Sequence, residues 1–266
     1  MTLYTNILLD YENSIEILFT LLPGTTLSYP NEVIEYVRAS DVKTVPHISS
    51  AGMREISFQM QTNVSKTLER QLDYFRRSGK SLLLFIPTEK FASEIVITDV
   101  SLPEIVSTYQ TFTINAYCYG VEGQSYLASD SDVILSANAT LTADSNALGG
   151  YTAKFLSNTD NMFFSTVADN VFVPAGNYLI VGRAKSKNSV ADGVLVGALT
   201  TYGVPLGTDT FTASTSAYGY YVVAGTLPIA QYGATVNTLV QQWGTDSNEI
   251  YSDLVAYVHS SGLITI

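Results

Sequence analysis

MREISFQM (residues 53–60) opens the stretch that decides the fold, and it is followed by SKTLERQLDYFRRS (65–78), SLLLFIP (81–87), EIVITDV (94–100) and TYQTFTINAYCY (108–119). The first and the last two segments alternate apolar and polar residues, which indicates strands with one buried face. The third is a short apolar run typical of a buried strand, and the second has the period of a helix. One isolated helix carried on antiparallel strands is typical of a scaffold, and the stretch contains no recognisable set of catalytic groups.

The helix over 65–78 has a defined start, packing face and end. Ser65 is a good N-cap residue. Leu68, Leu72 and Phe75 fall at i, i+4 and i+7, so we expect them to pack on the strands. Gly79 follows as the residue that ends the helix. The residues expected to form ion pairs, in solvent or at an interface, are Asp73, Arg76 and Arg77.

The segment SGKS (78–81) is similar to the end of a phosphate-binding loop. That pattern requires glycine five positions before Gly79, where this chain has Tyr74, and it requires a strand followed by a helix. Here the order is reversed. The segment is therefore interpreted as the end of the helix, and no nucleotide cofactor is predicted.

Composition extends the β interpretation to the whole chain of 266 residues. Only 14% of the residues are charged and 46% are apolar, while 18 Tyr and 18 Gly suggest strands joined by many turns. The net charge is −11, and residues 121–266 contain eleven acidic residues against four basic ones. A phosphate backbone needs clustered Lys and Arg, so this charge argues against nucleic-acid binding.

The sequence divides near residue 120. Residues 1–120 predict a β-barrel with one packed helix, and residues 121–266 predict a jelly-roll or galectin-like β-sandwich, with a linker at 120–125. In the first half, Asn6 to Leu22 fits strands or a helix, Glu32 to Val37 is expected to be a strand, and Asp41 to Pro46 a loop or the entry to a strand. The strands expected in the second half are 132–137, 153–155, 161–166, 171–182 (two strands around a Pro-Ala-Gly-Asn turn), 193–200, 217–224, 235–243, 253–260 and 263–266, the last after a turn at 260–262.

Groups for catalysis or metal binding are few. His47 and His259 are the only histidines and lie in different halves, and Cys118 is expected to be a buried thiol within a strand. The carboxylates lie mostly in predicted turns, where Asp bonds to its own backbone. We therefore predict no enzyme, no catalytic residue and no metal site. A structural calcium ion, held by Asp130 and Asp132 or by the segment 246–249, is the remaining alternative.

The aromatic residues of the last fifty positions are the one signal for a ligand. Trp243, Tyr220 and Tyr251 are the candidate contacts to a glycan, because sugar-binding sandwiches use exposed aromatic rings. The alternative is that these rings pack in the core, since Tyr also favours strands. The other tyrosines of this group are Tyr218, Tyr221, Tyr232 and Tyr257.

The cellular setting follows from three simple features. A single cysteine excludes an internal disulfide. The first ten residues lack the basic start of a secretory signal, and no apolar run approaches the roughly 18 residues of a membrane span. We therefore expect synthesis in a reducing cytoplasm and no membrane span.

The segments quoted for residues 53–119 resemble the tail-tube-like domain of tailed-phage baseplate proteins, a group that includes the distal tail protein. The resemblance covers about residues 30–120, and the sandwich that follows is similar to the outer domain of many distal tail proteins. It implies a homo-oligomeric, hexameric ring in the virion tail tip, with tail tube, tail hub and tape-measure proteins as partners. A receptor-binding protein or a host glycan would bind the sandwich. The strand edges of the barrel and its loops 24–30 and 41–52 are the expected ring contacts.

A second class of function stays open. The chain also fits a carbohydrate-binding module or adhesin, or an accessory protein of a glycan hydrolase. The missing secretory signal and the weak set of carboxylates argue against the hydrolase.

Overall fold

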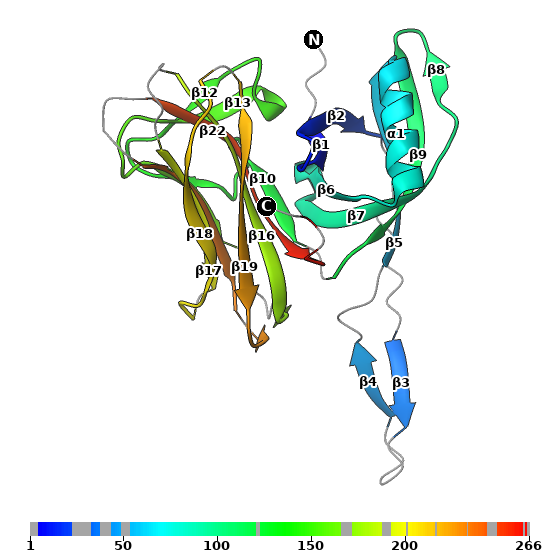
Figure 1. The fold of residues 1–266 in the computed structure, drawn as a ribbon. Helices are drawn as coiled ribbons and strands as arrows, with labels where there is room; N and C mark the ends of the chain where they lie inside the picture. Colours follow the sequence, from blue (N-terminus) through cyan, green and yellow to red (C-terminus); the bar gives the residue numbers. More distant parts are fainter. Residues whose placement is uncertain are drawn as a thin grey trace.

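The computed structural model describes residues 5–22, 33–37, 44–48, 54–120, 123–165, 172–187, 193–200, 202–215, 217–232, 234–243, 249–262 and 264. Within these ranges the protein is mainly β with one α-helix, as the sequence predicts. The strands form a barrel and a two-sheet sandwich that lie side by side (Figure 1). The barrel strands precede residue 119 and the sandwich strands follow residue 123.

Six antiparallel strands close the barrel in the order β5-β2-β1-β6-β7-β9, and pairing of β9 with β5 completes the circle. β8 (Glu104–Val106) pairs with β9 outside this circle, and within the described residues its other edge has no strand partner. A single 3₁₀ turn, η1 (Pro87–Glu89), joins β6 to β7. The barrel strands are β1 (Asn6–Asp10), β2 (Ile15–Leu21), β5 (Arg54–Asn63), β6 (Ser81–Ile86), β7 (Phe91–Val100) and β9 (Tyr109–Cys118).

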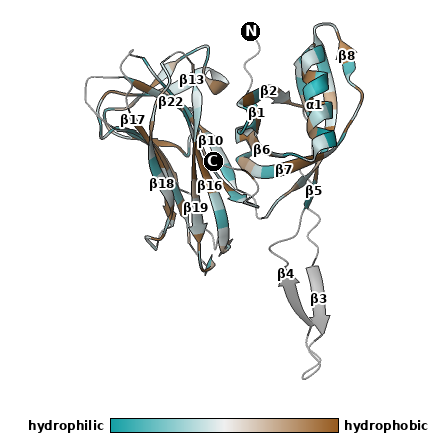
Figure 2. Ribbon diagram, in the orientation of Figure 1, coloured by the Kyte–Doolittle hydropathy of each residue, from teal (hydrophilic) through white to brown (hydrophobic). Residues whose placement is uncertain are grey.

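The helix α1 (Lys66–Ser78) forms as predicted. The Ser65 hydroxyl accepts a hydrogen bond from the Leu68 amide at 3.3 Å, and Gly79 ends the helix in the left-handed conformation, with φ of 60°. Leu68, Leu72 and Phe75 are buried in the barrel core. Figure 2 shows hydrophilic and hydrophobic residues mixed around this helix. The ion pairs on its exposed side join Asp73 to Arg76 and Arg77.

The N-terminal region resolves into hairpins. The segment 6–22, which the sequence left open, is the hairpin β1–β2, with Ser14 in its turn at φ of 53°. β3 (Val33–Val37) pairs with β4 (Thr44–Ile48), and neither pairs with another described strand. The predicted strand at 32–37 is therefore confirmed, and of the two alternatives for 41–46 the strand entry is correct, because β4 begins at Thr44. The predicted ring-contact loop 24–30 lies outside the described residues, as does most of 41–52.

The sandwich consists of a six-stranded sheet, here called the middle sheet, and a five-stranded sheet, here called the outer sheet. The middle sheet contains β10 (Gln124–Leu127), β12 (Thr140–Ala143), β13 (Tyr151–Phe155), β16 (Gly176–Ser186), β19 (Gly219–Leu227) and β22 (Ile250–Ser260). The outer sheet contains β11 (Ile134–Leu135), β14 (Asn161–Ser165), β17 (Gly193–Thr200), β18 (Pro205–Thr212) and β21 (Val236–Trp243). The predicted sandwich is confirmed, and its finer likeness to a jelly roll or a galectin stays a prediction.

Two smaller elements complete the sandwich. β15 (Phe172–Val173) pairs with β20 (Gln231–Tyr232), and the 3₁₀ turn η2 (Leu148–Gly150) precedes β13. The predicted turn between β15 and β16 falls at Pro174 and Ala175, but the two strands do not pair with each other. The strand expected at 263–266 lies almost entirely outside the described residues.

The middle sheet is buried on both faces. One face packs against the outer sheet around Phe155, Phe164 and Ile180. The other face packs against the barrel wall, which explains why β16 and β22 are buried almost continuously along their length. The barrel and the sandwich therefore share one apolar interface. Its main residues are Ile7, Leu9, Leu83 and Phe85 from the barrel and Leu179, Val181, Val222, Leu254, Ala256 and Val258 from the middle sheet.

The two sheets of the sandwich also meet at one corner, where β19 approaches β18. A side-chain carbon at Gly225 would lie 1.0 Å from the Leu206 carbonyl oxygen, and one at Gly207 would lie 3.0 Å from the Ala224 carbonyl oxygen. Only glycine allows the two backbones to approach so closely at Gly225.

Candidate functional site

The outward side of the outer sheet is the first candidate surface. Alternate residues of β21 from Val236 to Gln242 are fully buried, so the residues between them, such as Leu239 and Gln241, point away from the core. Trp243 continues this outward series and is 51% exposed.

Outward residues of neighbouring strands line up in rows across this sheet. The central row contains Ile134, Phe163, Leu239, Gly197 and Thr208. The row on one side contains Asn161, Gln241, Leu195 and Thr210. The row on the other side contains Ser165, Asn237 and Leu199. We call these residues, together with Trp243, the outer face. None of them is charged, and the central row is apolar over three strands.

Trp243 stands at one end of the outer face. It pairs with Gly193 of β17, and a side-chain carbon at Gly193 would lie 3.2 Å from Trp243 Cδ1. The bare backbone of Gly193 therefore leaves room for the indole ring beside it.

The structure does not bring the three predicted glycan contacts together. Trp243 belongs to the outer sheet, whereas Tyr220 and Tyr251 belong to the middle sheet. Tyr220 donates a hydrogen bond to Glu16 of the barrel, and Tyr251 donates one to Glu249 at 2.6 Å. Tyr220 is thus a residue of the barrel–sandwich interface. The sequence-based candidates did not include the outward residues Phe163, Leu239 and Gln241, although the alternation of their strands is a signal that could have identified them.

The middle sheet holds a group of ion pairs and tyrosines, here called the ion-pair cluster. All four basic residues of 121–266 belong to it. Lys154 and Lys187 pair with Glu249 at 3.0 and 2.8 Å, and Lys185 pairs with Asp144 at 2.5 Å. The remaining members are Arg183, Asp253, Tyr218, Tyr220, Tyr251 and Glu16 of the barrel.

Arg183 and Asp253 form the buried end of this cluster. Arg183 pairs with Leu254 and Ala184 pairs with Ser252, so Asp253 is the extra residue of a β-bulge. The bulge places the fully buried Asp253 carboxylate on the Arg183 guanidinium, and the Leu148 amide also donates to Asp253, at 2.8 Å.

Burial disfavours the charged form of the Asp253 carboxylate. Loss of water raises the pKa of Asp253 to about 7, even though Arg183 lies beside it. Asp253 Oδ1 and Arg183 Nε have no hydrogen-bond partner among the described residues. Arg183 also reaches Glu16 at 3.3 Å and stacks on Tyr218 at 4.7 Å. Arg183 therefore links the sandwich to the barrel through Glu16, and both members of the buried pair are engaged in structural contacts.

Glu249, at the solvent end, should make stability depend on pH. Hydrogen bonds from Lys187, Tyr251 and Lys154 lower the pKa of Glu249 to about 2. Because the folded pKa lies below the unfolded one, the stabilisation is present above about pH 4.3 and is lost as the pH falls toward 2. We expect Glu249→Gln to lower the free energy of unfolding by ~1 kcal/mol at pH 7, limited by the exposure of Lys187.

Urea unfolding of both proteins at pH 7, 4 and 3 measures this effect. The difference between wild type and Glu249→Gln should shrink as the pH falls. Glu104→Gln, which changes an exposed carboxylate of β8, is the matched control and should show no such trend. A difference for Glu249→Gln that stays constant from pH 7 to pH 3 would contradict the assignment.

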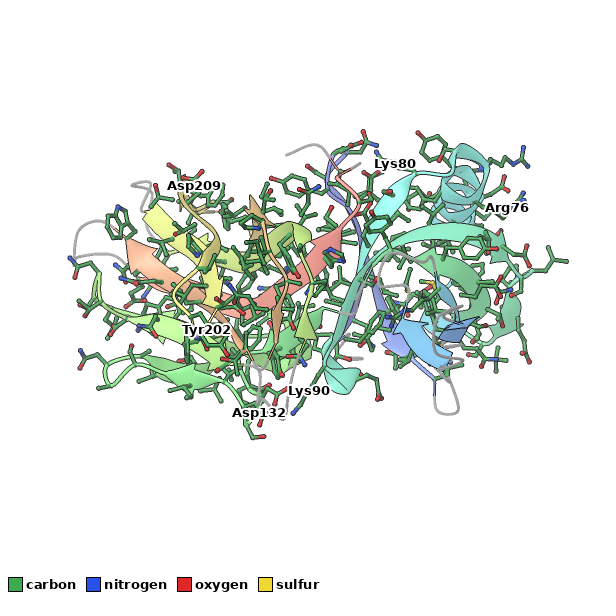
Figure 3. The ribbon with its side chains drawn as sticks, turned by 90° about the horizontal axis from the view of Figure 1, so that it is seen from below. Arg76, Lys80, Lys90, Asp132, Tyr202 and Asp209 are labelled. Atoms are coloured by element: carbon green, nitrogen blue, oxygen red, sulfur yellow. The ribbon has the colours of Figure 1, made fainter. Side chains whose placement is uncertain are left out.

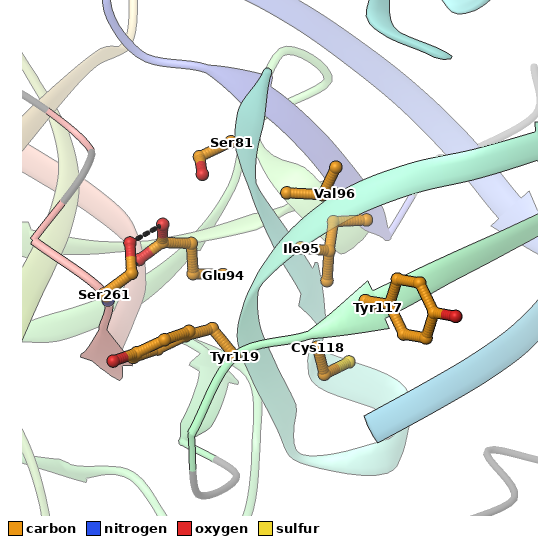
Figure 4. A pocket seen from close by; sticks show the side chains of 8 residues that line it. All are labelled: Ser81, Glu94, Ile95, Val96, Tyr117, Cys118, Tyr119 and Ser261. Atoms are coloured by element: carbon orange, nitrogen blue, oxygen red, sulfur yellow. Dashed lines mark hydrogen bonds between the residues drawn. The ribbon is translucent and has the colours of Figure 1, made fainter. Parts of the chain in front are cut away.

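A small pocket lies where β7 meets the end of β22 (Figure 4). The buried Glu94 carboxylate accepts hydrogen bonds from the Ser260 hydroxyl and the Ser261 amide, both at 2.8 Å, and from the Ser261 hydroxyl at 2.5 Å. The pocket beside it, lined by Cys118 and Tyr119, holds about 20 Å³, room for a single water. Glu94 therefore ties the end of β22 to the barrel, and Cys118 is buried as predicted.

His259 is also part of this joint. A side-chain carbon at Gly120 would lie 2.1 Å from His259 Nδ1, and one at Gly176 would lie 2.4 Å from Nε2. The imidazole thus fills the space between two glycines, both of which have positive φ. Burial lowers the pKa of His259. His47 lies on β4, and the side chains of this strand are not among those that the structure describes.

The calcium alternative finds little support at Asp130 and Asp132. Lys90 of the barrel forms an ion pair with Asp132, and Figure 3 shows the two residues where barrel and sandwich meet. Asp130 accepts a hydrogen bond from the Asp132 amide at 3.4 Å. In the second proposed set, Glu249 is already bound by two lysines, and residues 244–248 lie outside the described ranges. No group of three or more His, Cys, Asp or Glu in the described residues has a geometry that could hold a metal ion.

The edge strand β8 is the second candidate surface. All three of its residues are exposed, with Ile105 at 56% and Val106 at 64%. Leu102, just before the strand, is 93% exposed, and Val64, whose amide bonds to the carbonyl of Thr108, is 44% exposed. We call Leu102, Ile105, Val106 and Val64 the β8 patch. An apolar patch on a free strand edge is typical of a protein contact.

No helix among the described residues has the length and apolar character needed to cross a bilayer. No protein-family model matches the sequence, and no curated protein matches it.

Several solved structures resemble the chain in part. A family 35 carbohydrate-binding module from Clostridium thermocellum is 20% identical, with a TM-score of 0.38, over 50% of this chain and 97% of that one. The CBM35 from Cellvibrio japonicus Abf62 is 8% identical, with a TM-score of 0.39, over 52% and 94% of the two chains. An Arthrobacter globiformis T6 isomalto-dextranase complexed with panose is 11% identical, with a TM-score of 0.39, over 67% and 36%. At these identities and TM-scores, the likenesses assign neither a ligand nor an activity to this protein.

Proposed function

We propose that this protein is a structural subunit of a phage tail tip, in which the barrel assembles with further copies into a ring and the sandwich serves as an attachment point. The β8 patch is the observation that carries this proposal. Apolar residues exposed on both faces of a free edge strand are costly in a monomer and are stabilised by pairing with another chain.

Two further features of the fold support an assembly role. The strands β3 and β4 pair only with each other within the described residues, and a lone two-stranded hairpin is only marginally stable in water. A partner chain would supply the missing contacts. The barrel and sandwich also share an apolar interface, so the sandwich would keep a fixed position outside a ring of barrels.

The partners of this role follow from the resemblance of residues 53–119 to the distal tail family. The ring would join the tail tube to the tail hub, next to the tape-measure protein, in the tail tip of the virion. The proposed role is assembly and attachment, without catalysis.

Size-exclusion chromatography with light scattering tests the proposal. Wild-type protein should have the mass of a ring of about six subunits, as heterologous contacts between identical chains allow. A double variant, Leu102→Lys with Ile105→Lys, should elute mainly as a monomer with an unchanged circular dichroism spectrum. Ile229→Lys, which changes a residue of the sandwich that is 75% exposed, is the matched control and should remain assembled. A wild-type protein that stays monomeric at high concentration would overturn the ring.

A second candidate function is carbohydrate binding by the sandwich. The specific observation that favours it is the outer face, an uncharged sheet surface with an exposed Trp243 at one end. This function is compatible with the first, since an attachment domain can also be the part that contacts a host surface. A glycan array probed with the wild-type protein tests it, and absence of binding across the array would count against it.

A further inference from the structure

We propose that the outer face binds an uncharged glycan, which lies across the strands along the apolar central row. This inference rests on the second function proposed above and names its site and ligand class. Four properties of the outer face support it: its lack of charge, the arrangement of its rows, the length of its apolar strip and the fixed orientation of two of its amide groups.

Charge excludes an anionic ligand. The outer face carries no charged residue, and each of the four basic residues of 121–266 is engaged in an ion pair at the middle sheet. A phosphate, sulfate or uronate would find no cation on the outer face and would be repelled by the acidic excess of this half. A neutral ligand pays no such penalty.

The rows of the outer face match the two surfaces of a sugar ring. The apolar row through Phe163 and Leu239 fits the C–H face of a pyranose. The amides of Gln241 and Asn237 lie in the rows on either side, two residues along the strand or about 7 Å away, where the ring hydroxyls would point. A protein partner would instead favour a broad apolar centre with a polar rim. Over β14 and β21 the apolar strip is one residue wide between polar residues, whereas on β17 the flanking residues are Leu195 and Leu199. A narrow apolar strip with amides beside it favours a sugar chain.

The length of the strip suits a short oligosaccharide. Its apolar side chains lie on the three neighbouring strands β11, β14 and β21, and neighbouring strands lie about 4.8 Å apart, which gives a track of roughly 10 Å. Trp243 lies four residues beyond Leu239 on β21, about 13 Å away. Its exposed ring offers a second platform, on which a branch or a further sugar can stack.

Two of the amides are held in place before a ligand arrives. Gln241 Nε2 donates to the Asn158 carbonyl oxygen at 2.9 Å, and Asn161 Nδ2 donates to the Thr159 carbonyl oxygen at 3.3 Å. Both hydrogen bonds fix the orientation of the side chain and leave its amide oxygen as an acceptor. Such fixation lowers the entropy lost on binding.

Isothermal titration with neutral oligosaccharides (α- and β-glucans, mannans, galactans), compared with uronate-containing and sulfated ones, tests the inference on the full chain. The wild type should bind at least one neutral glycan and none of the anionic ones. Trp243→Ala and Leu239→Lys should each raise the Kd by about tenfold or more, the scale of a residue at the centre of a contact. Gln241→Ala, the mildest change, should act in the same direction.

Tyr202→Ala is the matched control, because Tyr202 is an aromatic residue of the same sandwich, 63% exposed, that is not part of the outer face. Its Kd should equal that of the wild type, and circular dichroism should show every variant folded. If the wild type binds a glycan but the outer-face variants bind it equally well, the site is wrong and the carbohydrate function survives. Equal binding of anionic glycans would overturn the ligand class. Binding of no glycan would overturn both the site and the function.

Discussion

Replacing Arg183 with alanine is expected to lower the free energy of unfolding by about 3–5 kcal/mol. The substitution leaves the fully buried Asp253 with the Leu148 amide as its remaining hydrogen-bond donor among the described residues. It also removes the contact with Glu16 of the barrel and the stacking on Tyr218. Urea unfolding at pH 7, followed by circular dichroism, measures the loss.

Two further variants distinguish the cost of leaving the Asp253 charge buried without its partner from the cost of losing an ordinary ion pair. Lys90→Ala breaks the other ion pair between barrel and sandwich, but Lys90 is 46% exposed, so its loss should be ~1 kcal/mol or less. Adding Asp253→Asn to Arg183→Ala should restore part of the stability, because the unpaired carboxylate is then neutral. If Arg183→Ala costs no more than Lys90→Ala, the buried charge of Asp253 does not depend on Arg183 for its stabilisation.

Replacing Gly225 with alanine is expected to cost about 3 kcal/mol or more, because the new methyl group would overlap the Leu206 carbonyl oxygen. The clashing atom belongs to the backbone of β18, so no rotation of a side chain relieves it. We expect the corner between β18 and β19 to open, with reduced yield of folded protein and a lower midpoint of thermal unfolding.

Gly203→Ala is the matched control for this change. Gly203 lies in the same sandwich and has positive φ, but nothing lies within 4 Å of an added carbon. Its cost should therefore be the backbone strain alone, about 1 kcal/mol. Equal losses for Gly203→Ala and Gly225→Ala would show that close approach of the sheets is not what the glycine provides.

The sequence predicted best where a local signal is complete. α1 has its N-cap at Ser65, its apolar stripe and its terminal Gly79, and every part is confirmed. Strands with one buried face, such as β5 and β9, were equally clear. The segment 6–22 was ambiguous because β1 is buried on both faces and shows no alternation. The edge strand β18 was missed because most of its side chains are exposed, so Asp and Thr replace the expected apolar residues.

The sequence-based prediction of the candidate site failed for a different physical reason. Alternation shows which residues of a strand share a face, but it does not show which strands are neighbours. Tyr220, Tyr251 and Trp243 therefore looked like one aromatic group, although strand order separates them onto two sheets. Similarly, the sequence predicted a linker at 120–125 but not the packing of β16 and β22 against β1 and β6. That contact joins residues far apart in the sequence.

Burial of the middle sheet on both sides has a consequence for binding in multiple copies. Two domains on a flexible linker would sample many relative orientations, and linker length would set the effective concentration of a second site. Here the apolar interface between barrel and sandwich fixes the relative orientation, and the effective concentration of a second site no longer depends on a linker. In a ring of such chains, all outer faces would stand at one fixed angle and spacing. A surface with matching ligand spacing would then be held by many weak contacts at once, whereas a surface with mismatched spacing would gain nothing from the extra copies.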